Sequence, residues 1–183
     1  MGNVLIGITG HRILSQEQKE RVNPVLEQAF RNIISAGSGP DGPISFTALS
    51  PLAEGADTMF ANTAVSLGLP LKVMLPYERQ EYLKSFSSDE ARREFDRIYD
   101  SVGEAHRSQL NSIKDKDLNQ LYLELGERLV DDIDILIAIW NEQKAKGKGG
   151  TGDIVAYAIG KKKRVLVINP ENDQPLINEV NPD

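Results

Sequence analysis

Short apolar runs alternate along the chain with longer stretches in which apolar residues recur at helical spacing. The runs predict strands buried on both faces, and the periodic stretches predict amphipathic helices. Strands are expected at residues 3–9, 44–49, 71–75, 134–140 and 165–168, and helices after a Ser15 cap and at 56–67, 117–131 and 151–159. This alternation predicts an α/β fold, a Rossmann-like three-layer sandwich with a mostly parallel sheet of at least five strands and helices on both faces.

Four segments depart from the alternation. Pro24 falls inside the first helix and should kink it, and residues 37–43 are expected to form a loop. Residues 77–116 lose the strand pattern and gain charge, which indicates a helical insertion or lid with helices near 78–86 and 89–100. Residues 170–183 form a polar acidic tail that we expect to be mobile. Residues 1–169 are then a single domain, as a chain of 183 residues allows.

The charge balance bears on the class of partner. The chain has 21 Lys and Arg against 27 Asp and Glu, a net charge of −6, and 6% of its residues are aromatic. Four of the acids lie in residues 170–183, so the net charge of residues 1–169 is close to zero. Proteins that bind long nucleic acids are usually basic, and those that bind single strands offer aromatic surfaces to the bases. Composition therefore argues against nucleic acid as a partner.

Cysteine and histidine content narrows the chemistry further. There is no cysteine, and the two histidines lie on different elements, so no metal site is assigned. Asp131, Asp132 and Asp134 could hold a divalent ion, but acids between a helix and a strand more often face solvent. No apolar run is long enough for a signal peptide core or a membrane span. We expect a cytoplasmic protein with no membrane contact.

The first candidate loop follows the first strand. Ligands of open parallel sheets bind at the carboxyl ends of the strands, near the point where strand order reverses. Gly10 permits a tight turn there, Thr9 offers a hydroxyl, and Arg12 offers a forked cation for a phosphate or carboxylate. Thr9, Gly10, His11 and Arg12 are therefore candidate ligand-binding residues. A plain strand-to-helix turn with exposed His11 and Arg12 is the alternative.

The second candidate loop runs from Ser50 into a predicted helix. The free N–H groups and the dipole of a helix N-terminus suit an anion, and Ser50 and Gly55 would let a phosphate or ribose approach the backbone. Glu54 and Asp57 are further candidates. Acids in the first turn of a helix also complement its dipole, so a purely structural role explains Asp57 equally well.

The third candidate loop joins a strand end to a glycine-rich turn that opens a helix. Residues 141–164 hold seven bases and two acids, and Lys144, Lys146 and Lys148 lie in the loop. The N–H groups of such a turn can cradle an anion, while a flexible loop with a helix cap would have the same composition. The ring of Trp140 could stack on a base or belong to the core. The candidate residues are Trp140, Asn141, Gly149, Gly150, Thr151 and Gly152.

Together these loops resemble the SLOG superfamily, the Rossmann-like fold of the DNA-processing protein DprA, the LOG phosphoribohydrolases and nucleotide-sensing domains. Residues 6–12 are similar to the glycine and arginine turn of DprA. Residues 50–57 resemble its Ser-Gly-Leu-Ala-x-Gly-Ile-Asp run, with Pro51 replacing a glycine. Residues 134–140 and the following Gly-Gly-Thr turn resemble the LOG pattern. The resemblance covers most of residues 3–169 and implies a nucleotide-binding domain and a homodimer.

Two departures from the LOG pattern bear on catalysis. The family's arginine before the fourth strand is Leu125 here, with Arg128 nearby, and its glutamate is Ile154, with Asp153 beside it. A general acid or base must lie within hydrogen-bond reach of the reacting atom, so both departures count against hydrolysis. If the chain is an enzyme, Asp153 and Arg128 are its candidate catalytic residues.

These observations favour one function and leave alternatives open. The main prediction is a sensor or carrier domain that binds a nucleotide or NAD-derived small molecule at the carboxyl edge of the sheet. Its phosphate would lie on Arg12 and residues 149–152. The alternatives are a LOG-like nucleoside 5'-monophosphate phosphoribohydrolase and DprA-like single-stranded DNA binding. A pterin or molybdenum-cofactor carrier would use the same pocket, and the sequence does not discriminate it.

Overall fold

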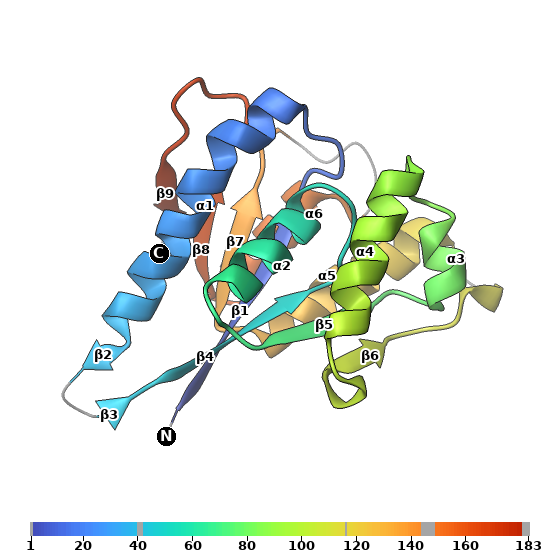
Figure 1. The fold of residues 1–183 in the computed structure, drawn as a ribbon, viewed down its shortest axis with the longest axis horizontal. Coiled ribbons are helices and arrows are strands. Elements are labelled where there is room, and N and C mark those ends of the chain that lie inside the picture. The colour runs from blue at the N-terminus through green and yellow to red at the C-terminus, as the bar shows by residue number, and fades with distance from the viewer. Residues whose placement is uncertain (1, 40–41, 116, 144–148, 181–183) are drawn as a thin grey trace.

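A seven-stranded sheet forms the centre of the molecule (Figure 1). The computed structural model describes residues 2–39, 42–115, 117–143 and 149–180. The strands lie in the order β6-β5-β4-β1-β7-β8-β9, and every neighbouring pair is parallel except β8 and β9. This confirms the predicted α/β class and the mostly parallel sheet. The strands are β1 (Asn3–Gly10), β4 (Ser45–Ser50), β5 (Leu71–Leu75), β6 (Arg107–Gln109), β7 (Ile135–Ile139), β8 (Arg164–Ile168) and β9 (Ile177–Val180).

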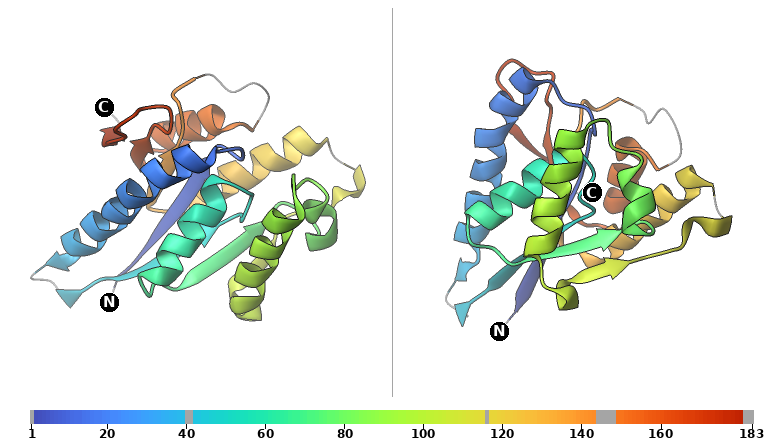
Figure 2. Two further views of the ribbon diagram at one scale, coloured as in Figure 1. Left: turned by 45° about the horizontal axis from the view of Figure 1, so that its top comes forward. Right: turned by 45° about the vertical axis from the view of Figure 1, so that its right-hand side comes forward.

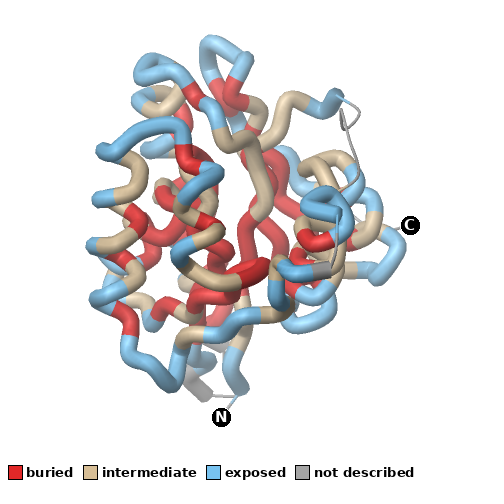
Figure 3. Tube along the Cα trace, turned by 90° about the vertical axis from the view of Figure 1, so that its right-hand side faces the viewer, coloured by how far each residue is buried: buried red, intermediate tan, exposed pale blue. Residues whose placement is uncertain are grey.

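Helices cover both faces of the sheet, as Figure 2 shows. Side chains of a strand point alternately to opposite faces. In β7, Ile137 and Ile139 pack in the core beneath α1 and α2, while Leu136 and Ala138 pack in the core beneath α5 and α6. Both sets are buried, and Figure 3 shows the buried residues gathered in the interior of the molecule. The helices are α1 (Gln16–Ala36), α2 (Ala56–Ser66), α3 (Arg79–Leu83), α4 (Asp89–Ser101), α5 (Leu118–Asp132) and α6 (Thr151–Gly160).

The helix after β1 begins at the predicted cap. The Ser15 hydroxyl accepts a hydrogen bond from the Gln18 N–H, and the Gln18 side chain accepts one from the Ser15 N–H. These two bonds satisfy N–H groups that the first turn of a helix leaves without partners. α1 continues through Pro24 as a single helix of 21 residues. Beyond it, the segment predicted as a loop contains a two-stranded antiparallel ribbon, β2 (Ser38–Gly39) and β3 (Gly42–Pro43).

Two strands of the sheet were missing from the sequence prediction. β6 lies within the segment interpreted as helical, and β9 lies within the tail that was expected to be mobile. Both are edge strands with one neighbour each, so neither needs the continuous apolar run that marks a strand buried on two faces. Arg164 of β8 and Glu179 of β9 form an ion pair across the edge, with Nε and Oε1 2.7 Å apart. Tail residues therefore pair with the sheet.

Residues 77–115 contain α3, α4, β6 and two short 3-10 turns, Glu104–His106 and Ile113–Asp115. Their aromatic rings pack on one another, and Tyr82 lies against both Phe86 and Phe95. Arg79 pairs with Asp96 and Asp100 of α4 at 2.6 and 2.9 Å. An aromatic cluster with charged edges explains why this charged segment is ordered. Its role as a lid stays a prediction.

Within the described ranges, no helix combines the length and the apolar character that a membrane crossing requires.

Candidate functional site

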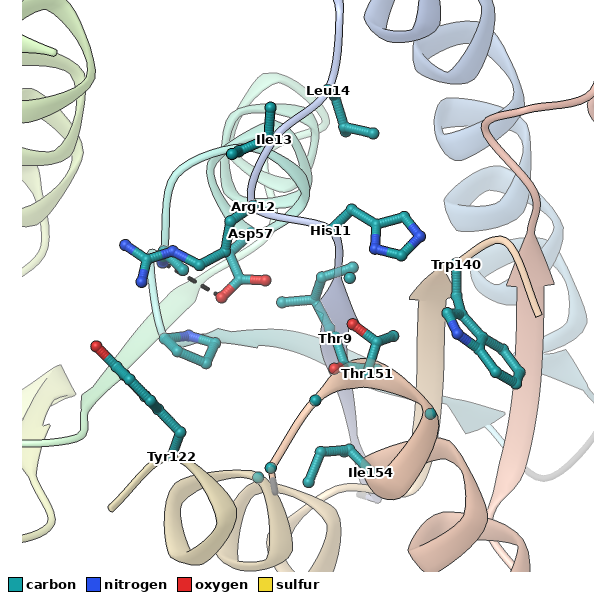
Figure 4. A pocket seen from close by; sticks show the side chains of 18 of the residues that line it. Thr9, His11, Arg12, Ile13, Leu14, Asp57, Tyr122, Trp140, Thr151 and Ile154 are labelled. Carbon is teal, nitrogen blue, oxygen red and sulfur yellow. Dashed lines mark hydrogen bonds between the residues drawn. The ribbon is translucent and has the colours of Figure 1, made fainter. Parts of the chain in front are cut away.

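A cavity of about 740 Å³ opens at the carboxyl edge of the sheet, where the strand order reverses. β1 lies between β4 and β7, so the loops that follow these three strands meet at this edge. The structure brings most of the predicted residues onto the cavity wall, and Figure 4 shows Asp57, Thr9, His11 and Thr151 around one space. The predicted residues that line it are Thr9, Gly10, His11, Arg12, Asp57, Trp140, Asn141, Gly149, Gly150, Thr151 and Gly152.

The loop after β1 is tied to the loop after β7. The His11 N–H donates to the Ile139 carbonyl at 3.1 Å, and the Asn141 N–H donates to His11 Nε2 at 3.2 Å. A ring nitrogen that accepts a hydrogen bond carries no proton, so this contact places the proton of neutral His11 on Nδ1. A Cβ at Gly10 would lie 2.4 Å from the Ala56 Cβ, so only glycine allows α2 to approach β1 this closely. His11 therefore has a structural task besides lining the cavity.

The loop after β4 is held by its own polar side chains. The Ser50 hydroxyl donates to the Asp57 carbonyl and accepts from the Leu52 N–H, both at 3.1 Å. Gly55 has a φ of +85°, and a Cβ there would lie 2.3 Å from the Arg12 carbonyl oxygen. Ser50 is fully buried, and neither it nor Gly55 lines the cavity. These two predicted residues shape the loop instead of facing the cavity.

Arg12 lines the cavity and joins three segments. Its Nη2 donates to the Ser85 carbonyl at 3.2 Å and the Ser85 hydroxyl at 3.0 Å, and lies 3.7 Å from the Glu54 carboxylate. Glu54 in turn accepts from the Ser87 hydroxyl at 2.7 Å and lies outside the cavity lining. The Arg12 Nε is buried and has no hydrogen-bond partner among the described residues. The side chain is 34% exposed and no described residue bonds to its Nη1, so this part of the guanidinium is able to bind an acceptor.

Asp57 is a buried acid on the cavity wall, at the N-terminus of α2. Burial raises the pKa of its carboxyl from 3.8 to about 7, although the Ala53 N–H and the charge of Arg12 both act to lower it. The Ala53 N–H donates to Oδ2 at 3.2 Å. The dashed line in Figure 4 marks this bond. Asp57 thus changes charge near neutral pH inside the cavity.

The N-terminus of α6 supplies the glycine-rich wall. Gly149 has a φ of +79°, and a Cβ there would lie 2.6 Å from the Leu123 nitrogen of α5. The Asp153 carboxylate accepts from the Gly149 N–H at 3.0 Å, so this N–H is occupied and Asp153 holds the turn that precedes α6. The next N–H groups, from residues 150–152, belong to the first turn, where a helix offers no internal acceptor. Lys144, Lys146 and Lys148, also noted from the sequence, lie outside the described residues.

Aromatic side chains line two sides of the cavity. Trp140 is half-buried against the core beneath α5 and α6, and its indole N–H donates to the Gln143 carbonyl at 2.9 Å. It therefore combines the core role and the cavity role that the sequence left open. Tyr122 of α5 and Tyr82 of α3 also line the cavity and were missed. Tyr122 belongs to the apolar stripe of a predicted helix, so its sequence pattern pointed to the core alone.

The candidate catalytic residues of the hydrolase alternative do not face the cavity. The Asp153 carboxylate bonds to the Gly149 N–H, as described above. Arg128 pairs with Asp132 one turn along α5, Nε to Oδ2 3.0 Å, and lines a separate depression of about 250 Å³. The spacing of the LOG motifs placed both residues near the cavity. The helix faces on which they lie direct their side chains away from it.

Acids near the end of α5 have structural partners. Asp131 pairs with Lys161 at 2.9 Å, and the Asp134 carboxylate accepts from the Leu5 N–H at 2.8 Å. Within the described residues, no three His, Cys, Asp or Glu side chains are grouped as a metal ion would require.

Comparison with known proteins finds similarity in structure alone. No protein-family model and no curated protein matches the sequence. The fold is similar to DNA processing protein A (DprA) from Streptococcus pneumoniae, with a TM-score of 0.58 and 15% identity over 90% of this chain and 50% of that one. It is also similar to DprA from Helicobacter pylori, with a TM-score of 0.57 and 12% identity over 90% of this chain and 64% of that one. The chain thus spans about half to two thirds of these proteins and shares their fold.

The comparison corrects the expectation about nucleic acid. The Helicobacter pylori protein is described by its single-stranded DNA binding mode. The exclusion of nucleic acid as a partner was therefore wrong, because a protein of this fold binds it. Net charge and aromatic content average over the whole chain, whereas binding depends on the few groups gathered at one edge of the sheet.

Proposed function

We propose that the protein binds single-stranded DNA and takes one nucleotide of the strand into the cavity at the carboxyl edge. The observation that carries the proposal is the composition of the cavity wall, where anion-binding groups and aromatic rings lie around one space. The similarity in fold to two DprA structures, one of them described by single-stranded DNA binding, supports DNA as the partner.

The phosphate would lie between Arg12 and the first turn of α6. N–H groups at a helix N-terminus combine open hydrogen-bond donors with the positive end of the helix dipole. Arg12 adds a cation whose side chain is 34% exposed and whose Nη1 has no hydrogen-bond partner among the described residues. Because Ser85 and Glu54 hold the guanidinium in place, it would lose little conformational freedom when it binds.

The base would lie against the aromatic part of the wall. Stacking on aromatic side chains is the usual way in which proteins bind unpaired bases, and it tolerates any sequence. Tyr122 and Trp140 approach the cavity from α5 and from the end of β7. The Tyr122 hydroxyl is fixed by a 2.9 Å hydrogen bond to the Tyr77 hydroxyl.

A free nucleotide or NAD-derived molecule is the second candidate. A volume of about 740 Å³ is within the range of small-molecule sites, which is roughly 300–1,000 Å³. In the described part of the chain, Arg12 is the sole Lys or Arg on the cavity wall, whereas a long DNA track needs several cations. These two observations favour a ligand that is held entirely within the cavity.

Replacing Arg12 with alanine should weaken DNA binding about tenfold, because one charged hydrogen-bonding group to a phosphate is lost. The measurement is fluorescence anisotropy with a labelled thymidine oligonucleotide of about 12 nucleotides. Arg31→Ala is the matched control, because Arg31 lies on α1 and pairs with Glu27. It should bind like the wild type.

Two outcomes would contradict the DNA proposal. One is the absence of binding to any oligonucleotide. The other is a thermal shift with AMP, NAD or ADP-ribose that an excess of oligonucleotide leaves unchanged, which would favour the second candidate. DNA binding should also weaken as salt rises from about 50 to 200 mM, because counterions are released from the phosphates.

A further inference from the structure

Asp57 and Tyr82 are the two most deeply buried polar side chains on the cavity wall. Asp57 is 6% exposed and Tyr82 is 1% exposed. They come from different elements, α2 and α3, and the negative charge of Asp57 acts on the Tyr82 hydroxyl. The fold therefore places a carboxyl and a phenol on the wall of the same cavity.

Both groups retain hydrogen-bonding capacity. Asp57 Oδ2 accepts from the Ala53 N–H, and no described residue bonds to Oδ1. No described residue bonds to the Tyr82 hydroxyl either, whereas the Tyr77 and Tyr122 hydroxyls bond to each other. Neither atom is among the fully enclosed side-chain atoms without a partner, so both are reached from the cavity, where a ligand can satisfy them.

The surroundings leave Asp57 available. The charge of Arg12 acts on Asp57, but the Arg12 Nη2 is directed to Ser85 and Glu54. No ion pair to Asp57 occurs within the described residues. At a pH above its pKa of about 7 the carboxylate is an acceptor only, and burial raises the pKa of the Tyr82 hydroxyl, which keeps it a donor.

An acceptor and a donor on one cavity wall are the groups that the Watson–Crick edge of a nucleobase requires, because that edge presents an N–H beside a carbonyl or ring nitrogen. A phosphate lacks the N–H and would meet the carboxylate as a like charge. For thymine, the N3–H would donate to Asp57 and a ring carbonyl would accept from Tyr82.

We infer that Asp57 and Tyr82 read the Watson–Crick edge of an unpaired base whose phosphate is held by Arg12 and α6. This inference rests on the proposed function. It also gives a physical reason for selecting single strands, because base pairing occupies the same edge in a duplex.

The test compares a thymidine oligonucleotide of about 12 nucleotides with the same oligonucleotide methylated at every N3. Methylation removes the N3–H that would donate a hydrogen bond to Asp57, and it leaves the face of the base free to stack on aromatic rings. Wild-type protein at about pH 8 should bind the methylated strand about tenfold more weakly, the usual size of a lost base-edge contact. Asp57→Asn and Tyr82→Phe should each bind the unmethylated strand more weakly and lose most of that tenfold difference.

Controls separate folding from recognition. Asp132→Asn removes a carboxylate outside the cavity and should keep the tenfold difference. Asparagine at position 57 can still accept from Ala53 and leaves an amide N–H₂ facing the base, so the loop should fold, as a thermal melt would verify. Equal wild-type affinity for both strands would overturn the inference while the DNA proposal stands. If Asp57→Asn and Tyr82→Phe both keep the full tenfold loss on methylation, the inference is likewise overturned and the DNA proposal stands. If the wild type binds neither strand, the inference and the DNA proposal are both overturned.

Discussion

Replacing Gly55 with alanine should destabilise the protein by about 3 kcal/mol, because the change adds backbone strain to a steric clash. Gly55 has a φ of +85° and a ψ of −118°, a region that side chains with a Cβ rarely adopt. The new Cβ would lie 2.3 Å from the Arg12 carbonyl oxygen and 2.6 Å from that of His11. Thermal melting should show a fall of roughly 6–12 °C for a chain of this length.

Gly68 provides a matched control for this substitution. It also has a positive φ, +75°, but a Cβ there would meet nothing within 4 Å. Gly68→Ala should therefore cost about 1 kcal/mol, the strain alone. Equal losses in the two variants would show that the loops after β1 and β4 do not pack as tightly as the structure has them. Gly55→Ala should also weaken DNA binding, since it displaces the backbone of Arg12.

Replacing Asp57 with asparagine should remove a large part of the pH dependence of stability. Burial raises the pKa of Asp57 from 3.8 to about 7 in the folded chain. Between these values the folded chain holds a proton that the unfolded chain has lost, so this stabilisation is present at low pH and disappears as pH rises through about 7. From about pH 5 to about pH 8 the loss for the wild type is roughly 2.5 kcal/mol. Asparagine does not titrate, so the Asp57→Asn variant should lack this loss of stability between the two pH values.

The measurement is the difference in unfolding free energy between wild type and Asp57→Asn at the two pH values. The two proteins differ in this one side chain, so the difference isolates the contribution of Asp57. Asp132→Asn controls for the removal of a carboxylate outside the cavity and should follow the wild type. Parallel pH profiles for wild type and Asp57→Asn would contradict the burial of an ionisable group at this position.

The sequence predicted the strands that are buried on both faces and the helices that cover them. β1, β4, β5, β7 and β8 were all visible as apolar runs, because both of their faces contact helices. β6 and β9 were not, since a polar edge strand is defined by the neighbour it pairs with. Tertiary pairing, not local composition, creates such strands.

The rule for carboxyl ends of parallel strands located the cavity, and much of its wall, from the sequence. Thr9, Arg12 and Asp57 lie there as expected, because a turn after a strand must leave the sheet at that edge. Ser50 and Glu54 were predicted by the same rule, but their side chains form hydrogen bonds within and between loops. The homodimer, the lid and the cytoplasmic location stay predictions.

Local periodicity and turn chemistry depend only on residues that are close together in the chain. The sequence by itself therefore determined the fold class, the order of elements and the edge of the sheet that holds the cavity. The direction of each side chain depends on packing between residues far apart in the chain. Only the tertiary structure therefore directed Arg128 and Asp153 away from the cavity, and only it placed Tyr82 of α3 and Asp57 of α2 on one cavity wall. A chemical subsite of this kind combines residues 25 positions apart, which no local pattern records.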